Sequence, residues 1–197
     1  QTELKFLKSQ YHPHFLFNAL NTVYFQIDES NKAPRRTLEM ISELLRYQLY
    51  GGNQKVSILQ EIDYLKTYIA LRKLRMSERL RLRVEFPPEL NELNIYPLLF
   101  LPLVENAFKY VGGDYQLDII MKWENNRISL FIRNSIPELS AEDEALRKSV
   151  DERQRKGIGL VNLRRRLSLL YPNKHRLETR KEETEFVAEL MIEIEDI

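Results

Sequence analysis

The sequence predicts an α+β protein in which an N-terminal helical hairpin precedes an α/β sandwich. Before residue 80, apolar residues recur at three- and four-residue steps in three stretches, as in amphipathic helices. After residue 80, several runs alternate between apolar and polar residues, and helical stretches lie between them. That order is typical of a mixed or antiparallel sheet covered on one face by helices. We therefore expect a helical domain over residues 1–80 and a second domain over residues 81–197.

The composition is that of a globular protein with room for two small domains. The chain has 197 residues, of which 43% are hydrophobic and 30% charged,. It contains no cysteine, which excludes disulfides, thiolate nucleophiles and cysteine metal sites,. The longest apolar run, residues 96–104, is shorter than the roughly 20 residues needed to cross a bilayer,. Because Gln1 falls within the first helical pattern, we expect the chain to continue a longer protein.

Charge is unevenly distributed along the chain. Residues 1–83 carry 14 Lys and Arg against 8 Asp and Glu, whereas residues 84–197 carry 16 against 21. A basic first part suits an acidic partner or phosphates, although a solvated helix face explains the same residues. We expect no nucleic acid as partner, since the acidic second part offsets the basic residues and no aromatic stacking platform is visible.

Three helices are expected in the first part. The first runs to about residue 28, the second has Pro34 in its first turn and ends at Gly51, and the third extends from the N-cap Ser57 to about Arg79,. A single hairpin leaves its apolar stripe uncovered. A homodimer that completes a four-helix bundle would cover it.

The second part alternates strands and helices. Strands are expected at 81–86, 116–124, 128–134, 175–181 and 186–194, and helices at 97–111 and 159–171,. Asn125-Asn126 predicts a tight turn between two of the strands,. Residues 136–156 are charged and weakly periodic.

The first helical stretch contains a histidine next to a helix breaker. Pro13 removes a backbone hydrogen bond within the helix, at a cost of about 3 kcal/mol,. His14 follows it, and Gln10, Asn18 and Asn21 lie on the same helix face,. One interpretation is a hydrogen-bonded helix histidine beside a kink. The other is a reactive imidazole within a polar stripe.

The string Pro-His-Phe-Leu-Phe-Asn at residues 13–18, followed by Leu20-Asn21, resembles the phosphoacceptor motif of the LytS-type sensor histidine kinases. The resemblance implies that ATP phosphorylates His14, with Asn18 in the same catalytic site. It also implies a GHKL-type (Bergerat) ATP-binding domain, Mg²⁺, and transfer of the phosphoryl group to an aspartate of a response regulator. The chain would then be the cytoplasmic portion of a sensor anchored in the inner membrane through an upstream segment. His12 departs from the motif, where the family commonly has asparagine.

A second cluster lies on the expected helix at 97–111. Glu105, Asn106 and Lys109 place a carboxylate, an amide and an ammonium within one turn, which suits a magnesium–triphosphate complex,. The alternative is a polar edge of a core helix. With the preceding prolines, the string resembles the N box of the same kinases, which implies that Asn106 coordinates Mg²⁺. Glu105 is a candidate for orienting or deprotonating His14, because Phe15 cannot accept a proton.

A third cluster is rich in glycine. Gly157 and Gly159 stand ahead of a helix, where backbone N–H groups can approach phosphate,. Together with Leu160 and Asn162 they resemble the G box of the family, which implies nucleotide contact by all four. Arg155 stands where the family usually has one more glycine.

The end of the strand at 128–134 departs most from the family. GHKL ATPases use an Asp-x-Gly turn whose aspartate accepts a hydrogen bond from adenine. Here Asn134-Ser135 occupies that place, so an acceptor oxygen is kept and the charge is lost,. Adenine contact through Asn134 and a plain strand end are both compatible with these residues.

Two further functions remain compatible with the sequence. The first is a pseudokinase scaffold that binds a regulator without turning over ATP, which Asn134-Ser135 would favour. The second is a GHKL ATPase that acts as a conformational machine. The phosphoacceptor-like string at residues 13–18 argues against the second.

Overall fold

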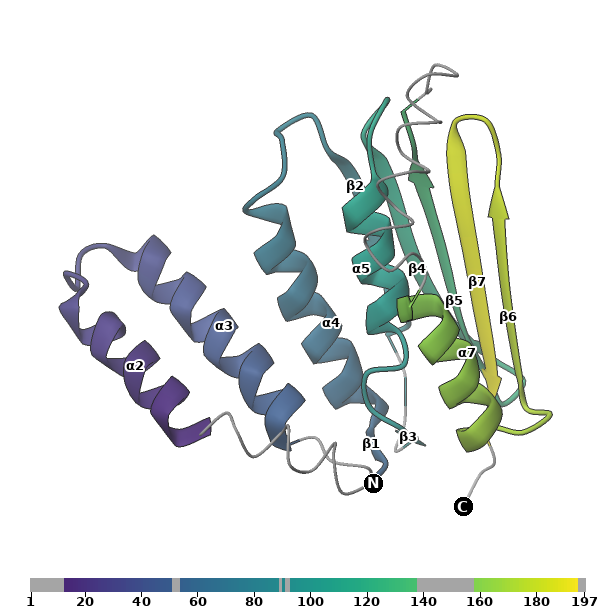
Figure 1. The fold of residues 1–197 in the computed structure, drawn as a ribbon, viewed down its shortest axis with the longest axis horizontal. Coiled ribbons are helices and arrows are strands. Elements are labelled where there is room, and N and C mark those ends of the chain that lie inside the picture. Colours follow the sequence, from purple (N-terminus) through teal and green to yellow (C-terminus); the bar gives the residue numbers. More distant parts are fainter. Residues whose placement is uncertain (1–12, 51–53, 89, 91–92, 138–157, 195–197) are drawn as a thin grey trace.

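A computed structural model describes residues 13–50, 54–88, 90, 93–137 and 158–194. Its first two helices, α2 (Pro13–Gln26) and α3 (Lys32–Tyr50), run side by side as a hairpin (Figure 1). Asp28 forms the turn between them, since its Oδ1 accepts hydrogen bonds from the Ser30 N–H at 2.8 Å and from the Ser30 hydroxyl at 2.5 Å,. The predicted helical hairpin is therefore present. The part of the first predicted helix at residues 1–12 lies outside the described residues.

The third helix, α4 (Ile58–Lys73), begins at the predicted N-cap but ends early. Ser57 Oγ accepts the Leu59 N–H and Gln60 Oε1 accepts the Ser57 N–H, both at 3.2 Å, which is a capping box,. The expected end near Arg79 is wrong. Beyond Lys73 the chain turns at Ser77, whose hydroxyl accepts the Arg79 N–H at 3.2 Å, and such side-chain bonds compete with those of a helix,.

The sheet has five strands in the order β2 (Arg81–Glu85), β4 (Gln116–Glu124), β5 (Arg127–Ser135), β7 (Glu185–Glu193) and β6 (His175–Lys181). β2 is parallel to β4, and the other neighbours are antiparallel. Asn125 and Asn126 connect β4 to β5 with φ of 52° and 59°. These left-handed values are those of the predicted tight hairpin turn. The predicted mixed sheet is confirmed.

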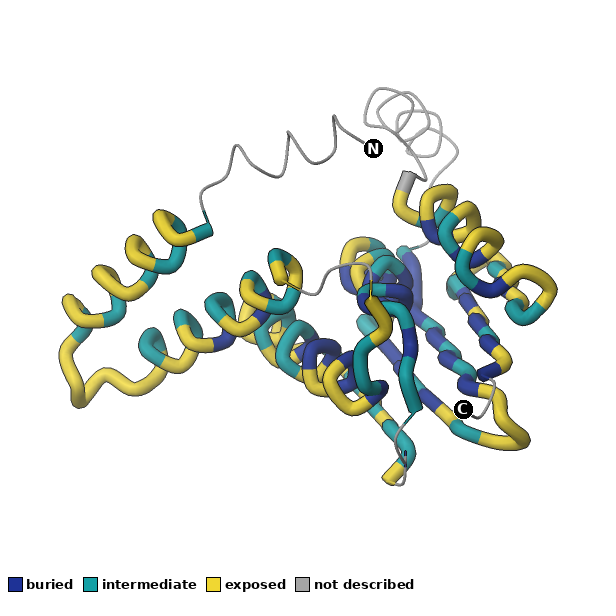
Figure 2. The backbone as a smooth tube through the Cα atoms, turned by 90° about the horizontal axis from the view of Figure 1, so that it is seen from below, coloured by how far each residue is buried: buried dark blue, intermediate teal, exposed yellow. Residues whose placement is uncertain are grey.

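Helices cover one face of this sheet. α5 (Leu101–Tyr110) and α7 (Ile158–Leu170) lie across it, and α4 lies beside α5 (Figure 1). The buried positions face each other across this layer, whereas α2 has no buried residue and α3 buries Met40 and Leu44 alone (Figure 2). The core includes Ile62, Leu65, Leu103, Val104, Phe108, Leu117, Ile119, Leu130, Ile132, Leu167 and Ile192. No helix within the described part of the chain is both long and apolar enough to span a bilayer.

A second, two-stranded ladder connects α4 to the larger fold. β1 (Val56–Ser57) pairs antiparallel with β3 (Asn94–Ile95), directly before α4 and shortly before α5. The sequence did not indicate this ladder. Because α4 also contributes to the core of the sheet layer, contacts extend across the boundary expected at residue 80. That boundary stays a prediction.

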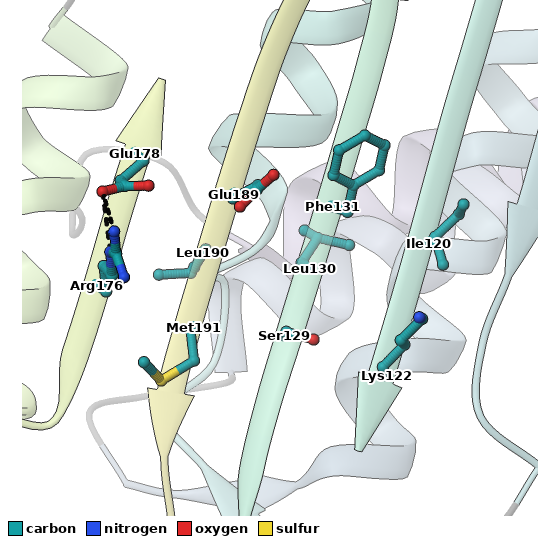
Figure 3. A pocket seen from close by; sticks show the side chains of 10 residues that line it. All are labelled: Ile120, Lys122, Ser129, Leu130, Phe131, Arg176, Glu178, Glu189, Leu190 and Met191. Atoms are coloured by element: carbon teal, nitrogen blue, oxygen red, sulfur yellow. Dashed lines mark hydrogen bonds and ion pairs between the residues drawn. The ribbon is translucent and has the colours of Figure 1, made fainter. Parts of the chain in front are cut away.

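The other face of the sheet is charged. Arg133 pairs with Asp118 at 2.7 Å, and Arg176 pairs with Glu178 at 2.7 Å. Figure 3 shows a shallow hollow on this face, with Ile120, Lys122, Ser129, Phe131, Glu189 and Met191 among the residues that line it. Successive residues of a strand point to opposite faces, so Phe131 and Asn134 face different sides of β5. The hollow therefore lies apart from the predicted adenine contact.

Candidate active site

His14 is exposed in the first turn of α2, and Asn18 holds it from one turn further on. Asn18 Nδ2 lies 3.1 Å from His14 Nδ1. The same turn packs against the end of α3, where the rings of Phe17 and Tyr50 stack with centroids 6.3 Å apart. The guanidinium of Arg46 lies 5.7 Å from the Phe17 ring centre. The imidazole is therefore both accessible and oriented.

Glu105, Asn106 and Lys109 all lie on α5, but their side chains do not converge on one point. Glu105 is exposed, yet partial desolvation raises the pKa of its carboxyl, and Arg72 of α4 opposes this shift. Lys109 Nζ lies 5.0 Å above the ring centre of Tyr110. Among the residues with described positions, no three His, Asp or Glu side chains gather as a metal site. Asn106 is partly buried on the same helix.

Asn134 lies at the end of β5 on the face covered by helices and is fully buried. Its Nδ2 donates to the Ser135 carbonyl at 3.2 Å. Its Oδ1 is buried and has no partner among the described residues. A buried acceptor without a donor is unfavourable, so this atom fits a ligand that donates a hydrogen bond. The exocyclic amino group of adenine is such a donor.

Ser135 and the loop after α5 fix the place of Asn134. Ser135 Oγ donates to the Gly112 carbonyl at 2.6 Å, and the Gly112 N–H donates to the Ser135 carbonyl at 3.0 Å. A Cβ on Gly112 would lie 2.9 Å from Pro137 Cδ, and Gly113 has φ of 60°. The sequence analysis did not predict these hydrogen bonds between Ser135 and Gly112. The Gly112-Gly113 pair, which favours a tight turn, was the signal available for them.

The glycine-rich segment is described only in part. Gly157 lies outside the described residues. Gly159 stands in the first turn of α7, and no described residue outside its own turn has an atom within 4 Å of where its Cβ would be. Leu160 is partly buried and Asn162 is exposed. Among the described residues, none lies against the Cβ position of Gly159, which is compatible with phosphate contact at a helix N-terminus,.

The structure does not bring His14 and Glu105 together. α3 and α4 lie between α2 and α5 (Figure 1). Contact between the imidazole and the α5 residues therefore requires a movement of the hairpin or a second protomer. The role of Glu105 toward His14 stays a prediction.

Sequence reasoning also overlooked a buried carboxylate, Glu61 of α4. The Tyr47 hydroxyl donates to its Oε2 at 2.6 Å, and the Leu98 N–H donates to the same oxygen at 2.9 Å. Burial raises the pKa of Glu61, while these hydrogen bonds and the nearby N–H groups of Phe100 and Leu99 lower it. Its position on the core face of an amphipathic helix was the available signal.

The first part of the chain matches a known protein family. The model of the histidine kinase family matches residues 2–80. The sensor protein kinase HptS of Staphylococcus aureus, from strains USA300 and NCTC 8325 / PS 47, is 29% identical over 180 residues. That alignment covers 89% of this chain and 35% of HptS, so the chain spans about a third of these curated relatives.

The fold is similar to that of a solved kinase domain. The histidine kinase domain of the blue-light activated kinase EL346 from Erythrobacter litoralis has a TM-score of 0.50 and 14% identity. The match covers 98% of this chain and 96% of that chain. At this identity the likeness concerns the fold.

The prediction of a histidine kinase is confirmed, while the narrower resemblance to the LytS type stays a prediction. The family match over residues 2–80 and the curated relatives support a sensor histidine kinase, and the solved structure supports the fold alone.

Proposed function

We propose that this chain is the kinase core of a two-component system, which phosphorylates His14 from Mg-ATP and passes the phosphoryl group to an aspartate of a response regulator. The observation that carries the proposal is the exposed imidazole of His14 with its Nδ1 held by Asn18. A nucleophile anchored by a second group is the arrangement that such chemistry needs.

In the phosphorylation step, a ring nitrogen without a proton donates its lone pair to the γ-phosphorus. The N–P bond forms as the bond to the bridging oxygen breaks, and ADP leaves with that electron pair. With Asn18 Nδ2 donating, Nδ1 accepts and the proton of the neutral ring lies on Nε2,. A half-turn of the amide would present Oδ1 to an Nδ1–H and leave Nε2 free to attack. Only this second orientation leaves an unprotonated ring nitrogen free of Asn18, so we propose that Nε2 attacks while Asn18 Oδ1 accepts the Nδ1–H.

The described residues fit an adenine nucleotide. Mg-ATP would supply the phosphoryl group, and its magnesium would neutralise part of the negative charge of the triphosphate. Asn134 Oδ1 would accept from the adenine amino group, and the open backbone at Gly159 would face phosphate. Asn106 would ligate Mg²⁺ and Lys109 would face the phosphates, as their residue types suit. We assign Gly157, Leu160 and Asn162 to the same nucleotide site.

A homodimer is the second part of the proposal. None of the α2 side chains is buried, and Phe15 and Phe25 are 74% and 79% exposed. A hollow between α2 and α3 is lined by Leu20, Tyr24, Phe25 and Leu38, among others. A second hairpin would cover this apolar surface in a four-helix bundle.

We place the chain in the cytoplasm, where ATP and a response regulator are available, as a portion of a membrane-anchored sensor. The basic residues of the first part suit a regulator with an acidic phosphorylation pocket. Residues 1–80 would form the dimerisation and phosphoacceptor domain, and residues 81–197 the ATP-binding domain.

A catalytically inactive scaffold is the second candidate. It is favoured by Asn134, because an amide in place of a carboxylate makes a weaker bond to the adenine amino group. Such a scaffold would bind a regulator without forming phosphohistidine.

Labelling with γ-labelled Mg-ATP tests the two candidates. A kinase gives an acid-labile, base-stable label that is lost in His14→Gln and kept in His12→Gln and His175→Gln. His175 is a suitable control because its Nδ1 is held 2.7 Å from the Tyr171 carbonyl, on the edge strand β6. A label that persists in His14→Gln would contradict the assignment. Nucleotide binding without any label in the longer protein would support the scaffold.

A further inference from the structure

The turn before α5 is held in a strained conformation. Leu98 has φ of 57°, in the left-handed region that residues other than glycine, asparagine and aspartate seldom adopt,. Leu98 is partly buried, between the buried Pro97 and Leu99. Such strain persists only where the surroundings enforce it, and it concentrates at functional sites. The contacts of this peptide therefore matter.

Two side chains hold Leu98 from opposite sides. Glu61 Oε2 of α4 accepts the Leu98 N–H at 2.9 Å. Arg166 Nη1 of α7 donates to the Leu98 carbonyl at 3.4 Å. One residue thus bonds to helices on either side of α5, and both partners are long ionisable side chains.

Glu61 also supplies what α5 lacks. Phe100 occupies the N-cap of α5 and makes no side-chain capping bond. A helix start leaves backbone N–H groups without partners and favours negative charge nearby. Glu61 is fully buried and places its carboxylate there from another helix. Burying a carboxylate lowers stability unless its hydrogen bonds offset the loss of hydration. An apolar side chain at this position would therefore stabilise the fold better if the position served packing alone.

The same carboxylate connects to the hairpin that carries His14. Tyr47 of α3 donates to Glu61 Oε2 at 2.6 Å, and its ring stacks on Tyr64 at 4.6 Å. One turn further along α3, Tyr50 stacks on Phe17, which lies one turn after His14. Two side-chain contacts, joined by one turn of α3, therefore link the helix that carries His14 to the residue that holds Leu98.

We propose that Glu61 and Arg166 are positioning residues for the kinase reaction: they clamp Leu98 in its left-handed conformation, which fixes the start of α5 and hence Glu105 and Asn106. Tyr47 ties this clamp to the hairpin. The inference rests on the proposed function for its activity readout, but the clamp itself is testable without it.

The test uses second-site rescue. Glu61→Met keeps a long unbranched side chain but removes both acceptors, and it should lower the rate of His14 labelling at least tenfold. Leu98→Gly in the same chain should restore the rate to within threefold of wild type, because glycine adopts positive φ without help. Leu98→Ala is the matched control, since it also removes the leucine side chain but keeps the strain. It should not restore the rate.

A second readout separates this inference from the kinase assignment. Hydrogen exchange of the first turn of α5 should accelerate at least tenfold in Glu61→Met and in Arg166→Met, and Leu98→Gly should reverse the change. If wild type never labels, the kinase proposal fails and the exchange result still decides on the clamp. The clamp proposal would be overturned if hydrogen exchange and labelling were unchanged in both Met variants. It would also be overturned if Leu98→Ala restored the rate as well as Leu98→Gly does. If Glu61→Met does not fold, Arg166→Met with the two Leu98 variants gives the same decision.

Discussion

Asn18 Nδ2 lies 3.1 Å from His14 Nδ1, one helical turn away on an exposed face of α2. Such a bond orients the imidazole and determines which ring nitrogen carries the proton. Asn18→Ala should therefore slow labelling of His14 by about tenfold, the worth of one hydrogen bond. Asn21→Ala is the control, since Asn21 is an equally exposed amide on the same helix. Equal rates for wild type and Asn18→Ala would show that Asn18 has no part in the reaction.

Asn134→Asp should change nucleotide affinity and stability in opposite directions. A carboxylate is a stronger acceptor than an amide, so Mg-ATP binding should tighten by calorimetry if Asn134 faces adenine. The free protein should lose about 1–3 kcal/mol of stability, because the Nδ2 bond to the Ser135 carbonyl is replaced by two facing acceptors,. Asn106→Ala should weaken magnesium-dependent binding alone. Unchanged affinity in Asn134→Asp would argue for a plain strand end.

Two glycine substitutions should separate ligand contact from packing. At Gly159 an added Cβ meets no atom of the described residues outside its own turn within 4 Å, so Gly159→Ala should leave the free protein stable or raise its stability by up to about 1 kcal/mol,. It should nevertheless weaken Mg-ATP binding, since the methyl group occupies the proposed phosphate position. Gly112→Ala should lower stability by about 1–3 kcal/mol, because its Cβ would lie 2.9 Å from Pro137 Cδ,. Thermal melts with and without nucleotide measure both effects.

The stability of the protein should depend on pH through Glu61. Burial raises the pKa of this carboxyl above its ordinary value of 4.5, so the folded protein binds the proton more readily than the unfolded chain. The resulting stabilisation is present below the unfolded pKa and is lost as pH rises through the folded pKa. Burial also raises the pKa of Tyr47, which stays neutral over this range.

Glu61→Gln cannot ionise, so its free energy of unfolding relative to wild type should increase from about pH 4.5 toward neutrality. The increase is about 1.4 kcal/mol for each unit by which the pKa is raised. Urea unfolding of both proteins across this range measures the difference. Parallel stability curves would mean that Glu61 titrates at its ordinary pKa.

Dimerisation should depend on the exposed aromatic residues of α2. Phe25→Ser should raise the dimer dissociation constant at least about tenfold, since each buried phenylalanine contributes roughly 1.5–3 kcal/mol and symmetry doubles the loss. Leu169→Ser is the control, because Leu169 is 73% exposed on α7, away from the hairpin. Light scattering over a dilution series distinguishes them. A wild-type protein that remains monomeric at the highest concentration of the series would contradict the four-helix bundle.

Local signals made most elements predictable. The bounds of β4 matched the expected strand, the Asn125-Asn126 turn has the expected left-handed angles, and Ser57 caps α4 as expected. Each of these depends on residues close in sequence, whose pattern or turn chemistry is visible without the fold. The same holds for the exposed face that carries His14 and Asn18.

What escaped prediction depends on distant contacts. The two-residue strands β1 and β3 are too short to show a period, and they exist only because they pair with each other,. The carboxylate beside the start of α5 belongs to Glu61, which is far away in sequence and accepts the Leu98 N–H. The separation of His14 from Glu105 depends on how helices stack, which no local pattern reports.

The β1–β3 ladder limits how the hairpin can move. Val56 pairs with Ile95 and Ser57 with Asn94, and Ile58, the first residue of α4, is fully buried. The first turn of α4 is therefore anchored to the sheet side of the molecule. A movement that brings α2 and α3 toward the nucleotide must therefore hinge before Val56. We expect the two helices to rotate together relative to α4, whose start stays fixed, and not to slide along their axes.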